Sequence, residues 1–158
     1  HTLAIKEDGS LWSWGNGYAG KLGLGNTTYY SSPKQVGALT TWDTVSCGKY
    51  YTTALKTDGT IWAFGTGAQG QLGQGNTTNY SSPVQVGALT TWDKLTCGWY
   101  ATIATKTDGT LWTWGVNTYG QLGHGNITDL SSPVQVGALT TWLNIAGGAN
   151  HTSATNSA

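Results

Sequence analysis

Arginine and methionine are absent from this 158-residue sequence, proline occurs 3 times, and charged residues make up 9% of the chain. Seven lysines, scattered singly, balance seven acidic residues, so the formal net charge is zero. This distribution offers no basic patch for nucleic acid or for an anionic membrane surface. No stretch approaches the roughly 18 consecutive apolar residues of a transmembrane helix. We therefore expect neither nucleic acid as a partner nor insertion into a membrane.

The sequence consists instead of one unit of 50 residues, copied in tandem without insertion or deletion. Trp12, Trp62 and Trp112 mark the same position of successive units. We therefore predict a single tandem-repeat array over residues 1–158. Its units are residues 1–50, 51–100 and 101–150, followed by the start of a fourth unit at 151–158. The strand pattern of a unit starts at Trp42 and its counterparts, and His1 aligns with Tyr51, which lies in the middle of that pattern. We therefore expect the chain to be part of a longer array.

Each unit contains the pattern of four short strands, and no segment has apolar residues at helical spacing. The four strands of one blade are expected at 44–47, 52–57 and 60–64, with the fourth around Gln85-Val86. Pro83 precedes that fourth strand and has no backbone N–H to donate, so the strand lies at a sheet edge or begins at the proline. The predicted fold is all-β, with three four-stranded antiparallel β-propeller blades. Because propellers have roughly four to eight blades, we expect further blades or another chain to complete the ring.

Three Asp-Gly pairs, at 8–9, 58–59 and 108–109, separate the second and third strands of the units. Asp-Gly is typical of a two-residue type I′ hairpin turn, in which both residues have positive φ. We therefore assign these aspartates to turns and not to catalysis.

Glycine-rich segments match a cofactor motif only superficially. Gly15-Asn16-Gly17-Tyr18-Ala19-Gly20 fits the dinucleotide pattern G-x-G-x-x-G. That pattern binds a dinucleotide when a helix N-terminus follows it and binds the pyrophosphate. Here glycines continue at short intervals, so no helix is expected to begin. We expect no cofactor.

Histidine and cysteine residues form no recognisable catalytic or metal-binding set. His1, His124 and His151 occupy two different repeat positions. Cys47 and Cys97 lie one unit apart, which on neighbouring blades is too far for a disulfide, so we expect two buried free thiols. No Cys-x-x-Cys pair accompanies them. The sequence therefore predicts no catalytic residue, no metal site and no enzyme activity.

Several features of the unit together resemble the repeat of the regulator of chromosome condensation family. They are the Asp-Gly turn, the Trp-Gly pair (Phe64-Gly65 in the second unit), and Gly-Gln-Leu-Gly at 70–73 and 120–123, where the first unit has Lys21 in place of Gln. The resemblance covers all three units and implies a seven-bladed β-propeller. Members of the family act as nucleotide-exchange factors, a plant ultraviolet-B photoreceptor, parts of ubiquitin ligases and a secreted bacterial β-lactamase inhibitor.

The resemblance does not carry over any one of these activities. Residues 98–102 are similar to the photoreceptor's Gly-Trp-Arg-His-Thr, but Tyr100 and Ala101 replace the Arg and the His. Near-identical, low-charge arrays of this kind resemble those of secreted bacterial proteins and of bacteriophage virions. We therefore expect a structural or adhesive module that is extracellular or at a virion surface. The alternatives are an intracellular regulatory propeller, either exchange-factor-like or a ubiquitin-ligase scaffold, and a secreted enzyme inhibitor.

Binding residues are expected where the units differ, since a residue that the blade itself requires should recur. These positions are rich in aromatic and amide side chains, which suits protein surfaces or glycans. The expected partner contacts are Tyr18, Trp99, Tyr100, Tyr119 and His124. The expected partners are other protein chains or further blades, with glycans as an alternative. Neutral drift at exposed positions is the competing explanation.

Overall fold

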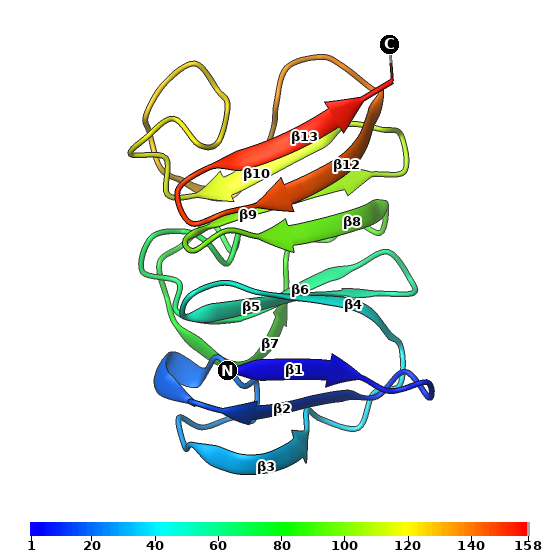
Figure 1. Cartoon of the computed structure of the whole chain (residues 1–158), viewed down its shortest axis with the longest axis vertical. Coiled ribbons are helices and arrows are strands. Elements are labelled where there is room, and N and C mark those ends of the chain that lie inside the picture. The colour runs from blue at the N-terminus through cyan, green and yellow to red at the C-terminus, as the bar shows by residue number, and fades with distance from the viewer. Residues whose placement is uncertain (158) are drawn as a thin grey trace.

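The computed structural model describes residues 1–157, which form antiparallel β-sheets stacked along the long axis of the molecule (Figure 1). The first sheet contains β1 (Thr2–Ile5), β2 (Leu11–Gly15) and β3 (Tyr30–Gln35). The second contains β4 (Trp42–Cys47), β5 (Tyr51–Lys56), β6 (Ile61–Gly65) and β7 (Tyr80–Gln85). The third contains β8 (Trp92–Cys97), β9 (Ala101–Lys106), β10 (Leu111–Gly115) and β11 (Leu130–Gln135). The fourth contains β12 (Trp142–Gly147) and β13 (Thr152–Asn156).

The expected all-β architecture with four-stranded antiparallel blades is confirmed, and the strands in each sheet follow one another in chain order. The distribution of strands differs from three complete blades, because a blade opens with the strand that begins at Trp42 or its counterparts. The chain thus holds two complete blades, the last three strands of a preceding blade and the first two of a following one. A short 3-10 turn, η1 (Tyr18–Gly20), is the one helical element in residues 1–157. No helix in this part of the chain has the length and apolarity to cross a membrane.

The two ends of the blades carry different connections. One end, here called the hairpin face, carries the tight turns between first and second strands (48–50 and 98–100) and the long glycine-rich loops (16–29, 66–79 and 116–129). The other end, the turn face, carries the Asp-Gly turns and the connections between blades (36–41, 86–91 and 136–141). Any contact residue in a loop therefore belongs to one of two opposite surfaces.

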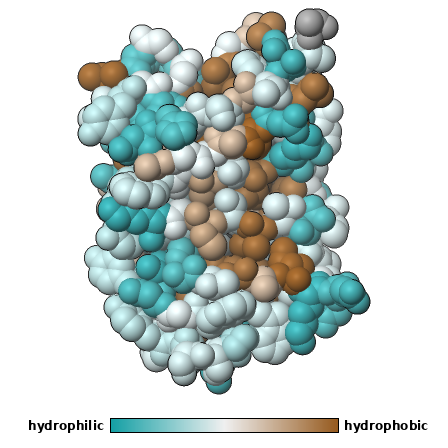
Figure 2. Space-filling view, in the orientation of Figure 1, coloured by the Kyte–Doolittle hydropathy of each residue, from teal (hydrophilic) through white to brown (hydrophobic). Residues whose placement is uncertain are grey.

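The hydrophobic core lies in the seams between successive sheets. One cluster joins the second and third sheets and includes the fully buried Tyr51 and Trp114. Another joins the first and second sheets around Leu11 and Phe64. No sheet buries both faces by itself, so the blades stabilise one another through stacking. The first strands lie side by side, and Figure 2 shows a band of apolar residues where β4, β8 and β12 lie in Figure 1.

The fourth strand of each blade is an edge strand, as its proline indicates. It begins three residues before the proline, at Tyr80 in the second unit, so the alternative start at the proline is wrong. The outer edge has no neighbouring strand, so the missing N–H of Pro83 leaves no ladder bond unmade.

The expected type I′ geometry of the Asp-Gly turns is wrong. Ala19 is the only non-glycine residue with positive φ in the described chain, so the aspartates lie at negative φ. In the second unit Gly59 N donates to Lys56 O (3.0 Å) and Lys56 N donates to Thr60 O (3.0 Å). The result is a three-residue loop in which Gly59 alone has positive φ (76°). Asp58 Oδ1 accepts bonds from Thr60 N (3.0 Å) and Thr60 Oγ1 (2.6 Å), which orients the aspartate within the turn.

Cys47 and Cys97 are both free, as expected, but only Cys97 is buried. Cys97 packs against β4, where its N donates to Ser46 Oγ (3.0 Å). Cys47 occupies the equivalent site on β4, next to a sheet that has no first strand in this chain. The expectation that Cys47 is buried is therefore wrong, because no strand covers this end of β4.

Candidate interaction surface

Four aromatic side chains and two lysines gather on the hairpin face between the first and third sheets. The tyrosine rings of Tyr18 and Tyr50 meet edge to face at 5.5 Å, and Tyr50 lies 6.2 Å from Tyr100. Lys49 Nζ lies 4.7 Å from the Trp99 ring centroid and 5.3 Å from the centroids of Tyr50 and Tyr100. Lys21 Nζ lies 5.2 Å from the Tyr50 ring. We call these six residues, Tyr18, Lys21, Lys49, Tyr50, Trp99 and Tyr100, the aromatic–lysine cluster.

Backbone hydrogen bonds between blades hold the cluster in place. Lys49 N donates to Trp99 O (3.1 Å), and Trp99 N donates to Gly148 O (3.3 Å). The hairpins that end the first strands are thereby linked from blade to blade. Tyr18 lies on η1, within the first glycine-rich loop, and η1 packs on the next sheet. A Cβ on Gly20 would lie 2.4 Å from Ser81 Cα, so only glycine permits this approach.

The cluster combines exposed contact area with positive charge. Tyr18 and Trp99 are 56% and 48% exposed, whereas Lys21 is only 4% exposed. Burial lowers the pKa of Lys21. The Tyr100 hydroxyl beside Lys49 raises the pKa of that ammonium, so Lys49 stays charged at neutral pH. Each cation facing a ring gains roughly 0.5–2 kcal/mol, which favours an ordered arrangement.

Of the five contact residues expected from the sequence, the structure brings three together. Tyr18, Trp99 and Tyr100 belong to the aromatic–lysine cluster. Tyr119 is 71% exposed in the third glycine-rich loop, and its N donates to Gln121 Oε1 (2.9 Å). It makes no ring contact within residues 1–157.

His124 lies apart from the cluster and contacts a strand of its own blade. Its Nε2 is 2.9 Å from Thr113 Oγ1, and burial lowers the pKa of the imidazole. Asp129, the nearest carboxylate in sequence, instead accepts a bond at Oδ1 from Asn117 N (2.7 Å). No hydrogen bond joins His124 to this acid in the described chain, and no group of three potential metal ligands occurs there.

Three members of the cluster, Lys21, Lys49 and Tyr50, were not among the predicted contacts. Lys21 replaces the Gln of the other two units, and Lys49 aligns with Trp99 and Ala149. These departures from the repeat were the available signal. Tyr50 gave a weaker one, because the second unit also has a tyrosine, Tyr100, at this position.

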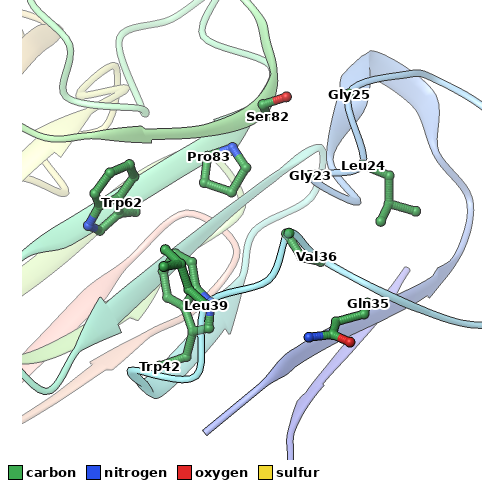
Figure 3. A pocket seen from close by; sticks show the side chains of 11 residues that line it. Gly23, Leu24, Gly25, Gln35, Val36, Leu39, Trp42, Trp62, Ser82 and Pro83 are labelled. Carbon is green, nitrogen blue, oxygen red and sulfur yellow. The ribbon is translucent and has the colours of Figure 1, made fainter.

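Two equivalent apolar grooves also lie at the seams between successive sheets. The first, of about 360 Å³, has Trp42, Trp62 and Pro83 on one side and Val36 and Leu24 on the other (Figure 3). The second, of about 460 Å³, has the equivalent residues one unit later, with Gln74 in place of Leu24. Since the grooves repeat with the blades and are lined by residues that the seams need, they indicate packing more than ligand specificity.

The recurrent charged residues of the turn face are explained by a repeated hydrogen-bond chain. Trp62 Nε1 donates to Thr60 Oγ1 (2.9 Å), and that hydroxyl donates to Asp58 Oδ1 (2.6 Å). Lys56 Nζ lies 3.9 Å from the Trp62 ring centroid. The hydroxyl of Thr60, its backbone N–H and, to a smaller extent, Lys56 lower the pKa of Asp58. The same set occurs in the other two units, which indicates a structural role.

Comparison with known proteins gives one consistent result. Three segments, at residues 8–55, 58–105 and 108–155, match the Regulator of chromosome condensation (RCC1) repeat. A 53-residue segment, 32% of this chain, is 42% identical to human E3 ubiquitin-protein ligase HERC2 and covers 1% of that protein; the mouse protein is 40% identical over the same length.

Solved structures resemble the chain over nearly its whole length. Human WBSCR16 has a TM-score of 0.83 at 24% identity, over 99% of this chain and 42% of that one. Prp20p from Saccharomyces cerevisiae has a TM-score of 0.86 at 16% identity, over 96% of this chain and 40% of that one. The chain thus spans about two fifths of these structures, and at such identities the likeness shows the fold.

Proposed function

Because the chain belongs to the regulator of chromosome condensation (RCC1) repeat family, we propose that it is a non-enzymatic scaffold that binds protein partners through its hairpin face. The observation that carries this proposal is the aromatic–lysine cluster, in which rings from three successive blades converge beside two cations. Aromatic side chains that are rigid and partly exposed are the usual anchors of protein interfaces. The cluster depends on blade stacking, so the array itself is the scaffold.

The relatives support a regulatory or ubiquitin-ligase scaffold, which the sequence left as an alternative. HERC2 is an E3 ubiquitin-protein ligase, although the matched segment is too small a part of it to carry that activity over. Prp20p is described by its binding properties to Gsp1p and histones. The virion or cell-surface module and its extracellular location stay predictions from a resemblance, and glycan ligands stay a prediction from the aromatic and amide side chains. We further propose that additional blades, from the same or another chain, complete the ring.

Capture of partners from a lysate of the organism that encodes the chain tests the proposal. The test variant carries Tyr18→Ala and Trp99→Ala, which remove the two most exposed rings of the cluster. The matched control is Tyr119→Ala, which removes an even more exposed tyrosine from the same kind of loop outside the cluster. We expect proteins held by the parent chain and by the control to be lost from the double variant. If all three chains retained the same proteins, the hairpin face would not be the contact surface.

A further inference from the structure

Two lysines approach the same tyrosine ring without any carboxylate to balance them. The Nζ atoms of Lys21 and Lys49 lie 5.2 and 5.3 Å from the Tyr50 ring centroid. In residues 1–157 the one ion pair is formed elsewhere, between Lys94 and Asp93 (4.0 Å). A ring face attracts a cation but carries no net charge, so the cluster keeps its positive charge.

Lysines on the turn face are in a different electrostatic environment. Lys6, Lys56 and Lys106 each stand over a tryptophan, at 4.4, 3.9 and 3.6 Å from the ring. Each also lies near enough to the aspartate of its own turn to help lower the pKa of that carboxyl, after the larger effect of the neighbouring hydroxyl. Their charge is therefore partly balanced within the blade.

Acidic residues are separated from the cluster by the blade topology. Six of the seven belong to the turn face, either in the Asp-Gly turns or at the start of a first strand: Glu7, Asp8, Asp43, Asp58, Asp93 and Asp108. Asp129 lies in the third glycine-rich loop, where its Oδ1 accepts the bond from Asn117 N. The chain has zero net charge, yet the hairpin face around Tyr50 is positive because six of the seven acidic residues lie at the other end of the blades.

From this charge pattern we infer that the aromatic–lysine cluster binds an acidic segment of a partner protein. A carboxylate of the segment pairs with Lys49 at the surface, and the buried charge of Lys21 below adds to the attraction. Tyr18 and Trp99 flank the segment and exclude water from the pair, which strengthens it. This inference rests on the proposed function and specifies the chemistry of its ligand.

The inference is tested with synthetic peptides and the full chain. The probe is a fluorescein-labelled peptide of sequence Gly-Glu-Glu-Tyr-Glu-Glu-Gly, compared with a twin in which every Glu is Gln. Lys49→Gln removes the partly exposed charge, and Lys21→Gln introduces the residue that the other two units have at this position, so it is compatible with the fold. Lys34→Gln, on the edge strand β3, is the control for an equal change in net charge. Circular dichroism verifies that each variant is folded.

Fluorescence anisotropy should show binding of the acidic peptide and not of its twin, with affinity falling as salt is added. Loss of one charge-assisted bond predicts about tenfold weaker binding for Lys49→Gln. Lys21→Gln should weaken binding a few-fold, because its charge acts from below the surface. Lys34→Gln should bind as the parent chain does.

Several outcomes would overturn the inference. One is equal binding of the two peptides, and another is an equal effect of Lys34→Gln and Lys49→Gln. A third is displacement of the peptide by equimolar inorganic phosphate, which would indicate a free anion as the ligand. Binding of a neutral oligosaccharide that is indifferent to Lys49→Gln would also overturn it. Lysate partners lost from the double variant but kept by Lys21→Gln and Lys49→Gln would refute the acidic ligand and leave the proposed function standing.

Discussion

Trp114 offers the sharpest test of the idea that packing between blades holds the array together. It lies on β10, is fully buried, and its ring is 6.0 Å from that of Trp92. Its Nε1 donates to Gln71 O (3.0 Å), in the glycine-rich loop of the preceding blade. Replacing this side chain therefore perturbs the seam between the second and third sheets and leaves the strand ladder intact.

The expected magnitude follows from the two kinds of contact that are lost. Replacing a buried tryptophan by alanine costs about 3–5 kcal/mol of unfolding free energy. The hydrogen bond adds at most about 1.5 kcal/mol, because Gln71 O still accepts a bond from Thr102 Oγ1 (2.9 Å). Trp114→Phe is the matched variant, since Phe64 fills the equivalent site of the second unit and is also fully buried. It keeps most of the apolar contact and should cost about 1–2 kcal/mol.

Urea unfolding followed by far-ultraviolet circular dichroism measures these costs, since nine tryptophans would mix their fluorescence signals. With a total stability of about 5–15 kcal/mol for a domain of ordinary size, Trp114→Ala should shift the midpoint strongly and Trp114→Phe modestly. If both variants unfolded within about 0.5 kcal/mol of the parent chain, the seam would not be the main source of stability. A larger loss for phenylalanine than for alanine would contradict the reasoning altogether.

Two further predictions concern the turn face and the buried lysine. Gly59→Ala should cost more than about 2 kcal/mol, because φ is 76° and the new Cβ would lie 2.2 Å from Thr90 O. Gly87→Ala, at φ 61° with no atom within 4 Å, should cost only the strain of about 1 kcal/mol, and equal urea midpoints for the two variants would show that the close approach is relieved. Burial lowers the pKa of Lys21, so the folded chain loses this proton before the unfolded chain does, and the contribution of Lys21 to the unfolding free energy should rise with pH between the lowered pKa and 10.5. Lys21→Gln should lack this rise, and parallel pH profiles for the parent and the variant would contradict the assignment.

The repeat and the local conformation of the strands follow from the sequence alone. Alternation of apolar and polar residues, the glycines that end strands, and Pro83 at an edge are local features, and each is repeated in three units. The turn type was missed because it depends on the bonds from Thr60 to Asp58, which the Asp-Gly pair itself does not reveal. Cys47 was misplaced for another reason: its exposure depends on whether a neighbouring strand is present, not on its own sequence context.

In the candidate interaction surface, too, some residues are indicated by the sequence and others are brought together only by the fold. Differences between units indicated Tyr18, Trp99 and Tyr100, which the fold brings together, but gave the same weight to Tyr119 and His124, which the fold places elsewhere. Lys21 and Tyr50 are 29 positions apart in the sequence, and only the stacking of one blade on the next brings them within 5.2 Å. The sequence by itself determined the repeating strands, because their patterns are local. The tertiary structure decided which variable residues share a surface and left two lysines there without an acid, because the packing between blades joins residues that no local pattern relates.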